Sequence, residues 1–504
     1  MSADGPVYFD YAATTPVDPR VAALMAECLC ADSTFGNPAS THSYGRAARA
    51  RVEAARAQVA ALIGARSPDI IFTSGATEAD NLAILGTVRG ARAPRGAPVP
   101  HVITAQTEHK AVLDPCHQLE REGVAVTFLT PQAEGRVLPE QLREALRPET
   151  VLVSLMHANN ETGAVQDVAA FGAICRAHGA ALHVDAAQSA GKLPIDVVAM
   201  GIDLLSFTAH KLYGPKGIGA LYVHTARRAA LQPLMFGGGH ERGLRSGTLP
   251  VHQIVGFGAA CELARALMAT ESARQAELRA RLWAAVRSLP GTLLNSPAEH
   301  CVPGILNVSF SGIEGENLLF GLTELALASG SACNSDSDEP SYVLRALGRD
   351  RQTAQSSLRF SFGRGTTAAD IDLAAIAVRR EISRLQAAAS AKAGSGAVHG
   401  EAGSREQGTW VRFMLHLSGD HIDAATHQFY GCPATQTACD WLVGQLQGRS
   451  WRHPDLGGPE DWARTLGIPL DRLTRLLVVE DALKAALAAA QQQGVGGGTM
   501  AATG

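Results

Sequence analysis

The chain has 504 residues, 46% of them hydrophobic and 18% charged, which is the profile of a soluble globular protein with two or three hydrophobic cores. Its formal net charge of −4 excludes the basic footprint of a nucleic-acid-binding protein. No apolar run approaches the roughly 20 residues of a membrane-spanning helix. We therefore expect neither nucleic acid nor a membrane among its partners.

The first residues, MSADGPVYFDYAATTP, lack the charged and apolar regions of a secretory signal peptide. The nine cysteines are odd in number and are scattered without the dense spacing of a disulfide scaffold. Both features favour a reduced, cytoplasmic setting in which free thiols are available for chemistry.

Apolar runs alternate with alanine-rich helical stretches from the amino terminus to about residue 389. The clearest runs cover residues 70–75, 151–158, 181–187 and 203–210. Strands that are apolar throughout and are separated by amphipathic helices predict an α/β fold with a parallel sheet covered on both faces.

The rest of the chain divides into three parts. Residues 390–408 are small and polar, which predicts a flexible linker. Residues 409–491 have the composition of a compact domain, and the glycine-rich residues 492–504 predict a disordered tail.

Polar segments follow the apolar runs at the ends of the predicted strands. Ligands of open parallel sheets bind beyond the carboxyl ends of the strands. The sequence therefore predicts one crevice built from residues 73–81, 159–166, 185–188 and 208–211.

The residues in this crevice suit an aldehyde cofactor. Lys211, just beyond an apolar strand, can form a Schiff base if it is desolvated, although a lone lysine is more often a surface residue. Asp185 ends a strand and can keep a pyridine nitrogen protonated. Residues 75–77 join a strand to a helix and offer an anion site, and His109 can stack on a ring and move protons.

Residues 7 to about 389 resemble the cysteine desulfurases of the NifS/IscS type, in the class V branch of fold-type-I pyridoxal-phosphate enzymes. The resemblance implies a large, mostly parallel sheet domain over about 16–260 and a small α+β domain over about 1–15 and 261–389. It rests on these blocks, in order: YFDYAATTP, FGNPASTHSYG, FTSGATEADNLAI, TEHKAV, HANNETGAVQ, HVDAAQSAGKLPID, SFTAHKLYGPKGIGALYV, GGGHERGLRSGTLP, SGSACNSDSDEPSYVLRALG and SSLRFSFGRGTT.

The resemblance also implies a role for each site residue. Lys211 would attach pyridoxal 5′-phosphate and Asp185 would pair with its ring nitrogen. The other expected contacts are to the ring oxygen from Asn160 and Gln188, to the phosphate from Ala76, Thr77, Thr208 and His210, to the phosphate from Thr248 of a second subunit, and to the substrate carboxylate from Asn37 and Arg359. A homodimer is therefore expected.

Cys333 determines the expected reaction. It lies in ASGSACNSDSDEPSYV, a stretch too small and polar for a core segment, whereas Cys175 and Cys261 have the surroundings of inert core thiols. The resemblance implies that Cys333, with Lys211 and His109, converts L-cysteine to L-alanine. The sulfur would remain on Cys333 as a persulfide and pass to an acceptor such as an iron–sulfur scaffold protein.

The segment from Trp410 to Leu487 resembles, more distantly, the U-type iron–sulfur scaffold fold. Of the three cysteines that such scaffolds use, Cys432 remains, and the third position is occupied by Arg475. A guanidinium cannot replace a thiolate ligand, and Cys439 lies about two helical turns from Cys432. We expect a degenerate α+β scaffold domain without a metal site, with sulfur transfer from Cys333 to Cys432 as the alternative.

Three other functions remain open. A class V aminotransferase or lyase would share the cofactor site without needing a thiol, and a selenocysteine lyase would differ only in the substrate's chalcogen. A sulfur-carrier adaptor with a vestigial enzyme half is the non-catalytic alternative.

Overall fold

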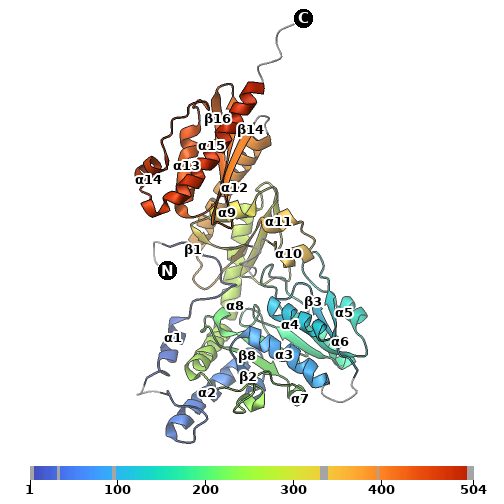
Figure 1. Cartoon of the computed structure of the whole chain (residues 1–504). Coiled ribbons are helices and arrows are strands. Elements are labelled where there is room, and N and C mark those ends of the chain that lie inside the picture. The colour runs from blue at the N-terminus through green and yellow to red at the C-terminus, as the bar shows by residue number, and fades with distance from the viewer. Residues whose placement is uncertain (1–4, 31–33, 93–97, 330–338, 394–396, 497–504) are drawn as a thin grey trace. The chain divides into compact units, whose positions relative to one another are not determined.

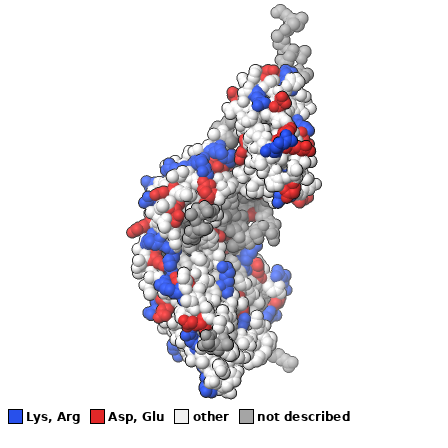
Figure 2. Space-filling view, turned by 90° about the vertical axis from the view of Figure 1, so that its left-hand side faces the viewer, with Lys and Arg blue, Asp and Glu red and all other residues white. Residues whose placement is uncertain are grey.

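The computed structural model describes residues 5–30, 34–92, 98–329, 339–393 and 397–496. The chain forms two compact units, Met1–Arg379 and Arg380–Gly504 (Figure 1). In the part of the chain that is described, no helix has the length and apolarity needed to cross a membrane. On the face shown in Figure 2, lysine and arginine are interspersed with aspartate and glutamate.

A seven-stranded sheet forms the centre of the first unit. Its strand order is β2-β8-β7-β6-β5-β3-β4, and β8 alone among these strands runs against the others. The carboxyl ends of the other six strands therefore meet at one edge. The strands are β2 (Ile70–Thr73), β3 (His101–Ala105), β4 (Ala125–Leu129), β5 (Thr150–Met156), β6 (Ala181–Asp185), β7 (Leu204–Thr208) and β8 (Gly219–Val223).

Both faces of this sheet are buried. Ile70 and Phe72 of β2 belong to one hydrophobic core and Ile71 to another, as the alternation of a strand requires. The first core is closed by α2 (Ser43–Leu62), α5 (Pro139–Ala145), α6 (Val168–His178) and α8 (Val251–Val286), and the second by α3 (Ala76–Arg92) and α4 (Lys110–Arg121). This double cover explains the uniformly apolar strands and confirms the predicted fold-type-I α/β fold with a mostly parallel sheet.

A second, antiparallel sheet of the first unit has the order β12-β13-β10-β9, and a short parallel pair joins β1 to β11. Helix α8 runs without interruption through the domain boundary predicted at 260/261, because its buried residues continue on both sides of it. The bounds are β1 (Val7–Tyr8), β9 (Thr292–Leu294), β10 (Ile305–Phe310), β11 (Leu325–Ala326), β12 (Ala328–Ser329), β13 (Ser357–Ser361), α1 (Pro19–Ala26), α7 (Thr225–Arg228), α9 (Gly315–Phe320), α10 (Tyr342–Ala346), α11 (Arg351–Gln355) and α12 (Ala368–Ala393).

The second unit has an α+β composition. Its sheet has the antiparallel order β14-β15-β16, and its core combines one face of the hairpin β15–β16 with three helices. The elements are β14 (Ala397–Ser404), β15 (Thr409–Ser418), β16 (His421–Tyr430), α13 (Pro433–Leu446), α14 (Pro459–Leu466) and α15 (Leu473–Gly496).

The predictions of a flexible linker over 390–408 and of a disordered tail from 492 are wrong for part of these ranges. Residues 397–404 pair with β15 along the whole of β14, and α15 continues to Gly496. The small residues of β14 serve packing: a Cβ on Gly400 would lie 1.9 Å from the backbone nitrogen of Ala486 in α15. Composition alone cannot distinguish a strand under a close-packed helix from a linker.

Candidate cofactor and substrate site

A cavity of about 620 Å³ opens at the carboxyl edge of the large sheet. Its volume is within the range of small-molecule sites. All four polar segments predicted for the crevice contribute to it. The lining includes Ser74, Gly75, Ala76, Thr77, Glu78, Asp80, His109, Asn160, Asp185, Ala187, Gln188, Thr208, His210, Lys211 and Arg359.

Asp185, the last residue of β6, is buried in this cavity. Its Oδ1 accepts a hydrogen bond from the backbone N–H of Ala187 at 2.8 Å. Burial, together with the nearby carboxylate of Asp80, raises the pKa of Asp185 to about 6, and the positive charge of Lys211, and of His109 when it is protonated, opposes this rise. A cationic ring nitrogen placed against this side chain would favour its ionised form.

A polar chain lies beneath Asp185 and was not predicted. His183, on the same face of β6, contacts Ser154 Oγ at 2.8 Å and Ser206 Oγ at 2.9 Å through its two ring nitrogens. Its Nε2 also lies 3.5 Å from Asp80 Oδ1. Burial lowers the pKa of His183 to about 4 and raises the pKa of Asp80 to about 7, so at neutral pH the histidine is neutral and the carboxyl is partly protonated. The one feature of the sequence that could have indicated this polar chain is Asp80, an aspartate among the buried apolar residues of α3.

Lys211 lies in a turn that directly follows β7, and the amino-terminal segment fixes this turn. Thr15 Oγ1 donates to the carbonyl of His210 and accepts from the backbone N–H of Tyr213, both at 2.8 Å. Thr14 Oγ1 lies 3.1 Å from His210 Nδ1. Tyr213 has a φ of 63°, a left-handed conformation that a non-glycine residue adopts only when its surroundings impose it.

The start of α3 forms an anion cradle. Residues 74–77 lead from β2 into this 17-residue helix, whose first N–H groups have no partner within the helix. Glu78 would repel an anion, but its carboxylate pairs with Arg245 at 2.9 Å and accepts from the N–H of Ser74. The Thr208 hydroxyl donates to Ile218 O at 3.2 Å, so it must rotate to donate to a phosphate.

His109 caps the amino end of α4. Its Nδ1 accepts from the backbone N–H of Ala111 at 3.1 Å, which requires an unprotonated Nδ1 and leaves the proton of the neutral ring on Nε2. Burial is the main cause that lowers the pKa of His109. The ring therefore lines the cavity in its neutral form and presents an N–H donor at Nε2.

Arg359 of β13 is buried at the cavity wall. Nη1 donates to Asn160 O at 2.9 Å, and Nη2 pairs with Asp10 Oδ1 at 2.6 Å. A substrate carboxylate would share this guanidinium with Asp10. Asn37, the other predicted member of the carboxylate clamp, is exposed and does not line the cavity of its own chain, because its Oδ1 accepts from the backbone N–H of Ala39.

Thr248 is exposed and also does not line this cavity. It was predicted to act in a second subunit, and that role stays a prediction. Cys333 lies outside the described residues, but the residues before and after its segment are close to the cavity. Ala328 of β12 pairs with Arg359 on β13, and after the segment Ser341 donates to Glu161 Oε2 and Tyr342 donates to Glu108 O.

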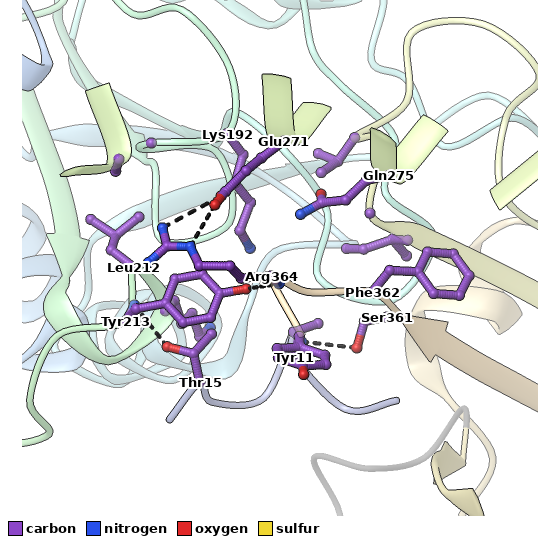
Figure 3. A pocket seen from close by; sticks show the side chains of 17 residues that line it. Tyr11, Thr15, Lys192, Leu212, Tyr213, Glu271, Gln275, Ser361, Phe362 and Arg364 are labelled. Atoms are coloured by element: carbon purple, nitrogen blue, oxygen red, sulfur yellow. Dashed lines mark hydrogen bonds and ion pairs between the residues drawn. The ribbon is translucent and has the colours of Figure 1, made fainter. Parts of the chain in front are cut away.

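Lys211 also lines a smaller cavity of about 30 Å³, whose surroundings Figure 3 shows. The Arg364 guanidinium beside it binds Glu271 and Asp18 and stacks over the Tyr213 ring at 4.0 Å. Lys192 and Gln275 extend into the same view. This network connects the strand end at Ser361 to the Lys211 turn.

The thiols outside the site divide by environment. Cys175 and Cys261 are buried as predicted, and burial raises the pKa of Cys175 to about 12. Cys432 caps α13, where hydrogen bonds from Thr435 and Ala434 give its thiol a pKa below the ordinary value although burial opposes them. Cys439 is fully buried within α13.

Arg475, at the position where a scaffold would have its third ligand, bonds Gln407 O at 3.0 Å and the Thr409 hydroxyl. It therefore ties α15 to the turn between β14 and β15. Among the described residues, no group of three or more histidine, cysteine or acidic side chains is arranged to hold a metal ion.

These residues fit pyridoxal phosphate. The cavity combines an amine that can attach an aldehyde, a buried carboxylate for a ring nitrogen and a helix start for a phosphate. A Cβ on Gly75 would lie 4.0 Å from Thr208 Oγ1, so the cradle stays open between the helix start and β7.

Comparison with known proteins agrees with this geometry. The class-V aminotransferase family matches residues 7–373. The chain is 55% identical over 382 residues to the cysteine desulfurase IscS of Escherichia coli O139:H28, covering 76% of this chain and 94% of that protein, and it is equally similar to IscS of Shigella boydii.

Two solved structures are similar over most of the first unit. A NifS-like protein matches with a TM-score of 0.68 and 34% identity, over 76% of this chain and 99% of the other. SspA in complex with cysteine matches with a TM-score of 0.63 and 40% identity, over 71% of this chain and 98% of the other.

Proposed function

Because the chain belongs to the class-V aminotransferase family and is a pyridoxal-phosphate enzyme of the cysteine desulfurase type, we propose that it takes sulfur from L-cysteine with Lys211, His109 and Cys333 as catalytic residues. The observation that carries this assignment is the position of the residues on either side of Cys333. The strand before it pairs beside Arg359, and the residues after it bond the chain next to Asn160 and His109.

When bound, pyridoxal phosphate supplies an aldehyde and an electron-withdrawing ring that weaken the bonds at the substrate's α and β carbons. Lys211 is the residue that would hold it, and the start of α3 with Thr208 and His210 would bind its phosphate. Asp185 would face the ring nitrogen, with its carboxylate oriented by the backbone N–H of Ala187. Gln188 and Asn160 would face the ring oxygen.

Proton movement falls to Lys211 and His109. The amine of Lys211, in its neutral form, takes the proton from the substrate Cα. His109, neutral and with its proton on Nε2, is a donor at that atom beside the cavity. Arg359 orients the substrate through its carboxylate, because a guanidinium offers two parallel donors.

Sulfur transfer requires the thiolate of Cys333. Its Sγ attacks the substrate Sγ, a new S–S bond forms and the Cβ–Sγ bond of the substrate breaks. The electron pair of that bond passes to the substrate carbon, which takes up a proton to give alanine. The persulfide then remains on Cys333 for an acceptor.

Two substitutions test this assignment. Cys333→Ser should keep the visible absorbance of the bound cofactor but lose sulfide release in the presence of a thiol reductant, and Lys211→Ala should lose that absorbance. Full sulfide release by the Cys333 variant would overturn the role of the thiol. Alanine formation without a persulfide would support the aminotransferase or lyase alternative, and preference for selenocysteine in competition would support the selenocysteine lyase.

We also propose a homodimer in which Thr248 reaches the partner's phosphate site. Met235 and Phe236, in the loop before Thr248, are 44% and 83% exposed, which is unusual for large apolar side chains. Sedimentation should give twice the chain mass, and Thr248→Val should weaken retention of the cofactor. A monomer that retains the cofactor fully would contradict this proposal.

For the second unit we propose a scaffold-like domain that has lost its metal ligands. The lowered pKa of the Cys432 thiol favours one further role, acceptance of sulfur. After incubation with cysteine, mass spectrometry should then find persulfide on Cys432 in the native protein and not in the Cys333→Ser variant. Absence of the label in both would leave the domain without this role. The cytoplasmic location stays a prediction.

A further inference from the structure

Lys192 is linked to the cofactor cavity by a hydrogen bond to Gln188, which lines that cavity. Its Nζ donates to Gln188 Oε1 at 3.0 Å, and Gln188 Nε2 in turn donates to the carbonyl of Ala12 at 2.8 Å. Gln188 is 3% exposed and lines the cavity. Both ends of its amide are therefore held by groups that belong to the protein.

These two contacts permit one orientation of the amide. A carbonyl can only accept a hydrogen bond and an ammonium can only donate one. If the amide turned over, its oxygen would face the Ala12 oxygen at any pH, and its N–H would face the Lys192 ammonium whenever that lysine is protonated. The second N–H of Nε2 is consequently available to an acceptor in the cavity.

The charge of Lys192 is not explained by an ion pair. Glu271 and Lys192 both line the smaller cavity of about 30 Å³, but the Glu271 carboxylate forms its ion pair with Arg364 (Figure 3). Among the described residues, no carboxylate lies within ion-pair distance of Lys192 Nζ. Burial, with the charges of Lys211 and Arg359, lowers the pKa of Lys192 to about 7. A lysine kept only for stability would be expected to have an acidic partner.

We propose that Lys192 is a positioning residue, which holds the Gln188 amide with its N–H turned toward the cofactor's ring oxygen. This inference rests on the proposed function, in which Gln188 faces that oxygen. Lys192 acts through Gln188 and touches neither the substrate nor the reacting atoms.

The test follows the visible absorbance of the cofactor bound to the full-length protein as a function of pH. A ring oxygen that loses a donor holds its proton more tightly. In Lys192→Met the midpoint of the spectral change should therefore rise by about one pH unit, the usual effect of a hydrogen bond to a charged group. Lys192→Arg, which keeps a donor, should restore the native midpoint.

A double-mutant cycle separates positioning from a simple loss of charge. In a Gln188→Ala background, Lys192→Met should produce no further shift. Lys216→Met removes another cation that lines the cavity, and it should shift the midpoint equally in both backgrounds. An equal shift for Lys192→Met in both backgrounds, or no shift at all, would overturn the proposal.

The same measurements distinguish this inference from the proposed function. If the native protein shows no bound cofactor that titrates, the assignment of Lys211 fails. If the native protein titrates and Lys192→Met does not differ from it, the role of Lys192 alone fails. Should Lys192→Met not fold, Lys192→Ala removes the same donor with a smaller side chain, and an unchanged midpoint there would count equally against the proposal.

Discussion

Some of the site residues can be predicted from the sequence, and others cannot. Lys211, Asp185 and His109 were predictable because each follows the carboxyl end of a strand, where chemistry collects in an open sheet. Asp80, His183 and Lys192 were not, because their effect depends on which side chain each meets after folding. The role of Asn37 in the carboxylate clamp stays a prediction, because its amide accepts from its own loop and does not line the cavity of its own chain.

Asp185 and Asp80 offer a matched pair of substitutions at the residue scale. Asp185→Asn removes the negative charge that keeps a ring nitrogen cationic, and we expect alanine formation to fall by about a hundredfold or more. Asp80→Asn should cost less, because burial raises the pKa of Asp80 to about 7 and its carboxyl is already partly neutral near that pH. Initial rates of alanine formation at saturating cysteine should be compared for the two variants. Equal losses of rate would contradict the assigned roles.

The buried Asp80 carboxyl should also affect stability. Its pKa is about 7 in the folded protein against 3.8 ordinarily, so the unfolded chain releases this proton first and the folded state loses stability as pH rises from about 4 to about 7. Asp80→Asn has no proton to lose. Its advantage in free energy of unfolding over the cofactor-free native protein should grow by about 2 kcal/mol between about pH 5 and about pH 8. Denaturant titrations at both pH values test this, and a constant difference would refute it.

At the scale of elements, a buried ion pair fixes the loop that follows β8. Arg56 of α2 binds Glu241 through both Nη atoms, at 2.7 and 2.8 Å, and Glu241 also accepts from the N–H of Phe72 in β2. Glu241→Ala would remove the buried partner of this guanidinium, leaving only the exposed Glu53 as a counter-charge, and should destabilise the first unit by about 3–5 kcal/mol. Glu53→Ala, which removes an exposed partner of the same Arg56, should cost less than about 1 kcal/mol. Similar losses in thermal unfolding would contradict the role of the buried pair.

The second unit contains an element that sequence reasoning mistook for a linker. Because Gly400 of β14 lies against the backbone of α15, Gly400→Ala should destabilise this unit by about 1–3 kcal/mol. Gly444→Ala, in α13 with open space around it, should be neutral or stabilising by up to about 1 kcal/mol. Denaturant unfolding followed by tryptophan fluorescence measures both. No loss for Gly400→Ala would restore the linker interpretation.

At the scale of the whole molecule, the residues of the enzyme site and those of the second unit belong to different parts of the sequence. The family match ends at residue 373, and the cavity residues all lie in the first unit. A chain ending at residue 393 should therefore keep at least about half of the native rate of alanine formation, because such units generally fold alone. Loss of bound cofactor from the shortened chain would show that the second unit supports the site.

The contacts of the amino-terminal segment with β13 bear on how the protein is made. Asp10 pairs with Arg359, and the N–H of Ala12 bonds the Ser361 hydroxyl, although 349 positions separate the members of each pair. Thr14 and Thr15, which shape the Lys211 turn, belong to the same segment. A ribosome-bound chain cannot make these contacts until translation has passed residue 361. The nascent polypeptide can therefore bind the cofactor only late in its synthesis.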